Sequence, residues 1–220
     1  MDGIESKERV GAHYHLPAME HAQAMTWRAV EQLAVRIEPG MTEGDAREAG
    51  RALLAELDMQ RIWHPLIVRF GANTLKPFKA QSDGDPVLGS DDIFFIDMGI
   101  VWNGHEGDAG ATFTTGGDPE MAACAAAAKT LYDDVSARWR QRDLTGQQLY
   151  EYAAAQATQM GWDLNLGIKG HRVSDFPHAI YRAGNLGDLG GLPGAGLWIL
   201  EIQIAHPHRP FGAFYEDLLV

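Results

Sequence analysis

The sequence lacks two features of exported and membrane proteins: it has only one cysteine, Cys124, and no long apolar run. One thiol cannot form an internal disulfide, and its alanine-rich surroundings predict a small buried side chain. A membrane-spanning helix needs about 18 or more apolar residues, and the charged residues 1–10 contain no apolar signal segment. We therefore expect a cytoplasmic protein with no membrane partner.

Basic residues are also scarce, with 18 lysines and arginines against 30 acidic residues and a formal charge of −12. This charge disfavours nucleic acid as a partner, because nucleic-acid sites need a basic surface. A solvated acidic surface explains most of the excess, and bound divalent cations would neutralise part of it. The 220 residues suffice for a sizeable core, and we expect a single domain over residues 1–220 with no separate N-terminal domain.

Four segments have the apolar spacing of helices, three of them with a capping residue at the start, and they come in two pairs. The predicted helices cover residues 17–37, a segment capped by Thr42, residues 118–140 and residues 145–160. Each pair leads into β-rich sequence, with predicted strands at residues 62–70, 93–101, 105–114, 198–205 and 213–220. This order predicts an α+β protein made of two helix–helix–sheet halves.

Two aspartates lie in the first predicted hairpin. Asn103-Gly104 separates two apolar runs and is typical of a two-residue turn, because both turn positions need a positive φ. That turn places Asp97 opposite Gly110. It also places Asp108 opposite Gly99, so that the two aspartates are diagonal neighbours on one face. A lone carboxylate in the apolar strand around Asp97 would be costly without a partner.

A second predicted hairpin carries two glutamates. If the turn around residues 207–210 is symmetric, Glu201 lies directly opposite Glu216. Four clustered carboxylates repel one another unless cations or protons lie among them. A softer nitrogen ligand would complete a metal site, and His171, after Gly170, is followed seven residues later by His178. Of the other histidines, we expect superficial or structural roles for His13, His15, His21 and His105, and leave His64, His206 and His208 undecided.

These segments together resemble the pita-bread metallopeptidases, a family that includes Xaa-Pro dipeptidase, aminopeptidase P and methionine aminopeptidase. The resemblance is closest to the Xaa-Pro branch and covers nearly the whole chain. It rests on four ordered motifs, namely residues 95–99, Gly107-Asp108, Gly170-His171, and Glu201 followed by residues 212–220. It implies a pita-bread fold, in which two halves are related by a pseudo-two-fold around a curved antiparallel sheet.

The resemblance also implies a dinuclear metal centre. Asp97 would chelate one ion, Asp108 and Glu216 would bridge both, and His171 and Glu201 would complete the other. This donor set suits manganese, iron, cobalt or zinc. Two such ions can bind a bridging water, lower its pKa and polarise a carbonyl.

The predicted function is therefore hydrolysis of an amide bond in a small peptide or a related small molecule. Glu201 would accept a proton from the water, and His178 would hydrogen-bond the substrate carbonyl. Two departures from the family pattern leave alternatives open: Phe78 stands where the Xaa-Pro branch has a substrate-binding histidine, and Ala111 where it has an arginine. The alternatives are a non-peptide substrate or a binding module without catalysis. A homodimer is left open.

Overall fold

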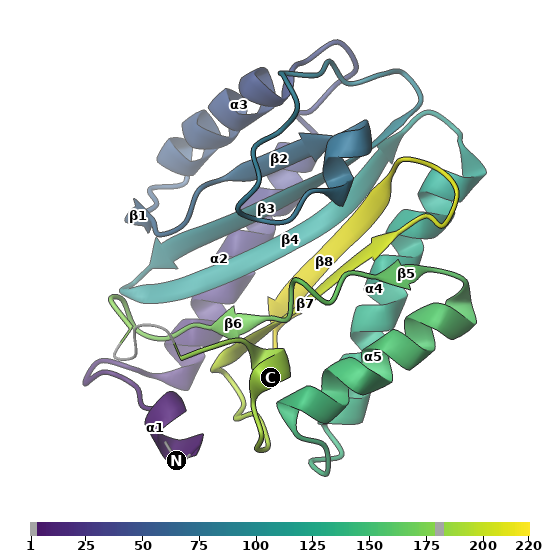
Figure 1. The fold of residues 1–220 in the computed structure, drawn as a ribbon. Helices are drawn as coiled ribbons and strands as arrows, with labels where there is room; N and C mark the ends of the chain where they lie inside the picture. The colour runs from purple at the N-terminus through teal and green to yellow at the C-terminus, as the bar shows by residue number, and fades with distance from the viewer. Residues whose placement is uncertain (1–3, 179–182) are drawn as a thin grey trace.

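The structure, a computed structural model, describes residues 4–178 and 183–220. Its α-helices are α1 (Ile4–Lys7), α2 (Leu16–Ala34), α3 (Glu43–Glu56), α4 (Pro119–Trp139) and α5 (Gly146–Met160), with 3-10 turns η1 (Gly71–Leu75) and η2 (Leu186–Asp188). In Figure 1, α2 and α4 lie behind one sheet, and α3 and α5 lie at its two edges. None of the helices in the two described ranges is long and apolar enough to cross a bilayer.

Helices α3, α4 and α5 begin where the capping residues predict. Thr42 and Thr145 each form a capping box, with Asp45 and Gln148 respectively. Asp118 accepts hydrogen bonds from two backbone N–H groups at the start of α4. These side chains satisfy backbone donors that a helix leaves without partners in its first turn. The predicted end of the first helix was three residues too late, because α2 stops at Ala34.

One eight-stranded antiparallel sheet joins the two halves of the chain. Its strands are β1 (Arg61–Ile62), β2 (Ile67–Phe70), β3 (Asp92–Trp102), β4 (His105–Thr115), β5 (Asp163–Leu164), β6 (His171–Arg172), β7 (Trp198–Ala205) and β8 (Gly212–Leu218). The strand order is β1-β3-β4-β8-β7-β5, with β2 also paired to β3 and β6 to β7. The predicted α+β class and the central antiparallel sheet are confirmed.

The prediction of one continuous strand over residues 62–70 was wrong. β1 and β2 both pair with β3, but Ile62 lies opposite Ile100 whereas Ile67 lies opposite Asp97. The chain between them therefore holds two more residues than the facing stretch of β3. Pro65 lies in this segment, and proline cannot donate a ladder hydrogen bond. The segment bulges over β3 as a result.

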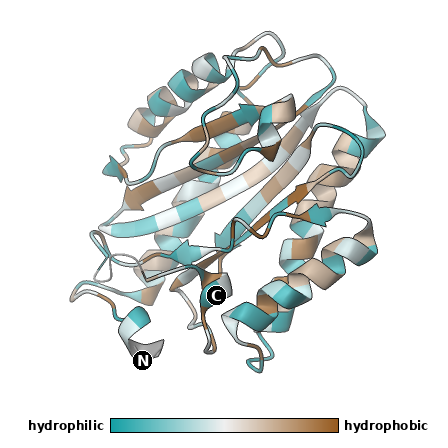
Figure 2. Ribbon diagram, in the orientation of Figure 1, coloured by the Kyte–Doolittle hydropathy of each residue, from teal (hydrophilic) through white to brown (hydrophobic). Residues whose placement is uncertain are grey.

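The two faces of the sheet have different roles. Successive side chains of a strand point to opposite faces, and on β3 alternate residues pack with α2 and α3 in one core cluster, namely Phe94, Ile96, Met98 and Ile100. A second cluster packs α4 and α5 against alternate residues of β7, namely Trp198, Leu200, Ile202 and Ile204. Figure 2 shows hydrophilic residues on the outer turns of α3 and α5. The face away from the helices remains for the acidic residues.

Candidate metal centre

The register predicted for the first hairpin is confirmed. Asn103 and Gly104 have φ values of 49° and 72°, as the two-residue turn requires. Asp97 pairs with Gly110, and Gly99 pairs with Asp108. Both aspartates are buried, with 5% and 0% of their surface exposed. The turn therefore brings two carboxylates together on the face away from the helices.

The second hairpin extends this arrangement across the sheet. Glu201 pairs with Glu216 as predicted, and Glu216 also pairs with Gly110 of β4. Asp97, Gly110, Glu216 and Glu201 thus form one row over four strands. A side chain at Gly110 would lie 3.0 Å from Glu216 Oε1 and 2.7 Å from the ring of Phe214. The glycine leaves the space in which the carboxylates of Asp97 and Glu216 approach each other.

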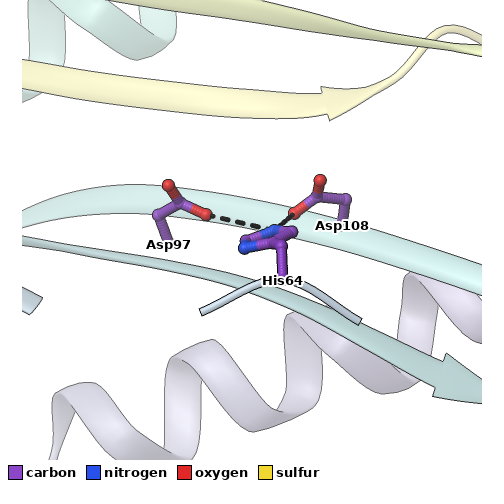
Figure 3. Close-up of side chains that lie close together, drawn as sticks. All are labelled: His64, Asp97 and Asp108. Atoms are coloured by element: carbon purple, nitrogen blue, oxygen red, sulfur yellow. Dashed lines mark hydrogen bonds and ion pairs between the residues drawn. The ribbon is translucent and has the colours of Figure 1, made fainter. Parts of the chain in front are cut away.

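Two histidines each contact a different oxygen of the Asp108 carboxylate. His171 enters from β6, and its Nε2 lies 3.0 Å from Asp108 Oδ2. His64 enters from the bulge between β1 and β2, and its Nε2 lies 2.8 Å from Asp108 Oδ1. The same nitrogen lies 3.5 Å from Asp97 Oδ1, so that Figure 3 shows the imidazole between the two carboxylates.

These side chains form two groups, and within each group the ligand atoms all lie within 4.8 Å of one another. His64, Asp97 and Asp108 form one group, and Asp108, His171 and Glu216 form the other. Asp108 belongs to both groups. Glu201 belongs to neither, although it faces Glu216 across the sheet. The sequence left His64 undecided, and the structure brings it into the site.

Gln23, on α2, positions Asp108 through its main chain. Its side-chain amide donates to the carbonyl oxygen of Asp108, and its side-chain oxygen accepts the N–H of Asp108 at 2.9 Å. The same amide also donates to the side chain of Asp217 on β8. The sequence gives no sign of this role, because a polar residue on a mostly apolar helix face has no recognisable partner until the strands are placed.

Burial and close charges set the protonation of the site. Burial raises the pKa of Asp97 to about 7 and raises the pKa of Glu216 well above its ordinary value. Burial alone would lower the pKa values of His64 and His171, but nearby carboxylates outweigh it and raise them to about 9 and about 10. The two imidazolium charges in turn hold the pKa of Asp108 below its ordinary value, against the effect of burial. Protons therefore offset the repulsion of the acids here.

The residues present fit a pair of divalent cations. Within the described part of the chain, no group donates a hydrogen bond to the buried Oε1 of Glu216. A buried carboxylate oxygen without a donor is costly, and a cation removes that cost. The donors are carboxylate oxygens and imidazole nitrogens, a set that suits first-row transition metals. Gly110 leaves room where these donors meet.

Metal binding should release protons and should strengthen as pH rises from 6 to 9. Ligands must lose their protons to bind a cation, and the pKa values of Asp97, His64 and His171 are raised to about 7, 9 and 10. In the metal-free protein, each of these groups holds its proton more tightly in the folded chain than in the unfolded chain. The folded state therefore loses stability as pH rises and these protons leave. Added cation at a hundredfold excess over Kd contributes about 2.7 kcal/mol, or roughly 5–10 °C in Tm for a chain of this size.

Melting curves with Mn²⁺ and with chelator at pH 6.0 and 8.5 measure this effect. Calorimetric titration in two buffers of different ionisation enthalpy counts the protons released. An equal shift in Tm at the two pH values, with no proton release, would contradict cation binding at this cluster of protonated side chains.

His178 pairs with a buried acid beside the two groups. Its Nδ1 lies 2.9 Å from Glu106 Oε2, and Glu106 is 1% exposed and two residues from Asp108 on β4. Glu106 and Asp108 lie on the same face of β4, because side chains alternate along a strand. His178 itself is in neither ligand group. Residues 179–182, which follow it, lie outside the described residues.

A cleft of about 570 Å³ opens beside the acids. Trp63, Phe78, Lys79, Lys169 and Glu201 are among its lining residues. Its size is in the range of small-molecule sites.

The two departures from the family pattern have different surroundings. Phe78 lines the cleft, with its ring edge-on to that of His64 at 5.5 Å between centroids. Ala111, in contrast, belongs to the core cluster beneath α2 and α3. The side chain of residue 111 therefore faces the helices and not the cleft.

The sequence matches one protein-family model, described as metallopeptidase family M24, over residues 17–219. No curated protein matches the chain.

Solved structures of low sequence identity share the fold. The X-Pro aminopeptidase of Thermotoga maritima MSB8 has a TM-score of 0.74 at 16% identity, with 97% of this chain and 60% of that chain covered. The prolidase of Pyrococcus horikoshii OT3 has a TM-score of 0.72 at 16% identity, with 98% and 61% covered. A methionine aminopeptidase of Thermotoga maritima has a TM-score of 0.67 at 15% identity, with 95% and 92% covered. The chain thus spans about 60% of the length of the first two and nearly all of the third.

Proposed function

Because the chain belongs to metallopeptidase family M24, we propose that it is a dinuclear metal-dependent hydrolase that cleaves an amide bond in a small peptide or a related molecule. The observation that carries this proposal is the pair of ligand groups that share Asp108. One carboxylate lies within reach of two separate donor groups, with an imidazole nitrogen close to each of its oxygens. This arrangement suits two cations better than one.

The ligands in this proposal are Asp97, Asp108, His171, Glu201 and Glu216. When bound there, divalent ions lower the pKa of water and polarise a carbonyl. Manganese, iron, cobalt and zinc all fit a set of four carboxylates and one imidazole. Asp108 and Glu216 would be the shared ligands, as the family resemblance implies, and the contacts of Asp108 with both histidines support its part in this.

Glu201 is the proposed proton acceptor. Its side chain is partly buried, and burial raises its pKa, although the positive charge of His171 and a hydrogen bond from the N–H of Gly170 act in the opposite direction. A raised pKa lies closer to neutral pH, so the carboxylate can take up a proton and return it during catalysis. Glu201 also lines the cleft, so a substrate there lies beside it. His178, held by Glu106, is the proposed donor to the substrate carbonyl.

The walls of the cleft favour a short peptide. Trp63 and Phe78 provide apolar surface, and Lys79 and Lys169 provide positive charge at the rim. Lys169 is partly neutralised by an ion pair with Asp188, at 3.0 Å. Lys79 therefore has more charge available for the terminal carboxylate of a peptide.

The proposed function is tested by metal analysis followed by turnover assays. We expect two ions per chain after preparation with Mn²⁺ or Co²⁺, and release of amino acid from a panel of short peptides. A chelator should abolish turnover, and added metal should restore it. Glu151→Gln, an exposed change on α5, serves as a control that should behave like the parent. A fully metallated protein that cleaves no peptide amide would contradict peptidase activity and favour a non-peptide substrate or a binding module.

A further inference from the structure

His64 and His171 are held in the same way. In each, Nδ1 lies near the carbonyl oxygen of the next residue, at 3.0 Å to Pro65 and 3.1 Å to Arg172. A carbonyl oxygen only accepts, so Nδ1 carries the hydrogen and Nε2 is directed at Asp108. Metal-binding histidines typically have this arrangement, in which a backbone carbonyl fixes the ring and one nitrogen faces the ion.

The bulge between β1 and β2 places the His64 ring. Trp63 still donates its N–H to the carbonyl of Gly99, and pairing resumes at Ile67 opposite Asp97, so residues 64–66 lie opposite Met98 alone. This puts the ring directly over Gly99. A Cβ there would lie 2.0 Å from His64 Cδ2, so that only glycine leaves room for the imidazole.

Two aromatic side chains pack against the His64 ring. Trp63 lies edge-on to it, with ring centroids 4.7 Å apart, and Phe78 lies edge-on at 5.5 Å. The His64 side chain is only 10% exposed. A ring held this tightly has lost most of its rotational freedom before any ligand binds, which lowers the cost of binding.

We propose that His64 is a further metal ligand, bound to the ion that Asp97 and Asp108 hold, so that each of the two ions has one imidazole. The proposal rests on the proposed function, because it adds a residue to the same centre. Two ligand atoms bound at about 2.1 Å to one ion lie roughly 3–3.5 Å apart. The His64 nitrogen lies 2.8 Å and 3.5 Å from the two aspartate oxygens. A second imidazole favours zinc, cobalt or iron over manganese and magnesium.

X-ray absorption at the zinc edge tests the proposal on the unmodified protein. With two Zn²⁺ per chain, we expect about one imidazole nitrogen per ion on average, whereas His171 alone would supply about half. The half value in a protein that holds two ions would overturn the proposal. This measurement needs no substitution, so folding of a variant does not affect it.

His64→Gln removes the imidazole and keeps a polar side chain. We expect this variant to bind one ion as the parent does and the other at least about tenfold more weakly, measured by titration with Co²⁺ and Zn²⁺. The visible Co²⁺ spectrum should lose the component that belongs to the weakened ion. His21→Gln, on the exposed side of α2, is the matched control and should leave both Kd values unchanged.

The two proposals fail in different ways. A parent protein that binds no tight divalent ion contradicts the dinuclear function as a whole. A parent that binds two ions, with His64→Gln equal to it in both Kd values, contradicts the role of His64 alone. A higher KM in that variant with unchanged metal Kd values would make His64 a substrate contact and would overturn its assignment as a ligand.

Discussion

Asp108→Asn should bind both metal ions much more weakly and should lose about 10³ or more in kcat/KM. Asp108 is common to both ligand groups, and its two oxygens lie 2.8 Å and 3.0 Å from His64 and His171. An amide keeps the size of the side chain but removes the charge that two cations would share. A metal ion contributes several kcal/mol to catalysis, and about 4 kcal/mol corresponds to a factor of about 10³.

The fold should survive this substitution. The bonds from Gln23 to Asp108 involve only its main-chain N–H and C=O, and asparagine retains both. Asp163→Asn on β5, where the side chain is exposed, is the matched control. Elemental analysis and metal titration would be made on both variants, with circular dichroism as a check on folding. Two ions per Asp108→Asn chain at unchanged Kd would contradict the bridging role.

The hairpins of the metal centre could be predicted because their registers depend on local chemistry. Asn103-Gly104 permits a two-residue turn, and once that turn is set every opposite pair in β3 and β4 follows. The same reasoning placed Glu201 opposite Glu216. Helix starts were equally local, since a capping residue acts on backbone groups within three positions of itself.

The position of His64 could not be predicted, because it depends on how two strands fit a third. A continuous strand over residues 62–70 would be aligned with β3 throughout, whereas the bulge adds two residues and turns the ring over Gly99. Pro65 was the available signal, since proline inside a predicted strand indicates an edge or a bulge. Contacts between distant segments leave no such mark. The hydrogen bonds between Gln23 and Asp108 and the pairing of His178 with Glu106 are contacts of this kind.

The departures from the family pattern illustrate the same limit. Both Phe78 and Ala111 differ from the residues that the Xaa-Pro branch implies, and the sequence gives them equal weight. Side chains alternate along β4, so that residue 111 faces the helices while Asp108 and Gly110 lie on the opposite face of the sheet. The change at Phe78 is therefore the one that alters the surroundings of a substrate.

Ordinary Xaa-Pro dipeptides should be poor substrates even for the fully metallated protein, and Phe78→His should improve their turnover by up to about 10²–10³. Productive cleavage needs donors that position the peptide and stabilise the developing negative charge, and loss of one donor typically costs about 10²–10³ in rate. Phe78 lines the cleft with Glu201 and has no donor to offer. Its backbone carbonyl accepts a hydrogen bond from Arg69, so the substitution changes the ring and leaves the backbone contact in place.

The measurement is kcat/KM on a set of Xaa-Pro dipeptides and N-terminal methionine peptides, for the parent, Phe78→His and Phe78→Leu. Leucine removes the aromatic ring without adding a donor, so it separates a gain in hydrogen bonding from a gain in space. If leucine improves turnover as much as histidine does, Phe78 limits the reaction by its size, because its ring packs against His64 in the lining of the cleft. Parent turnover of Xaa-Pro dipeptides at about 10⁴ M⁻¹s⁻¹ or more would contradict the prediction, because the existing side chains would then already supply the donor that Phe78 lacks.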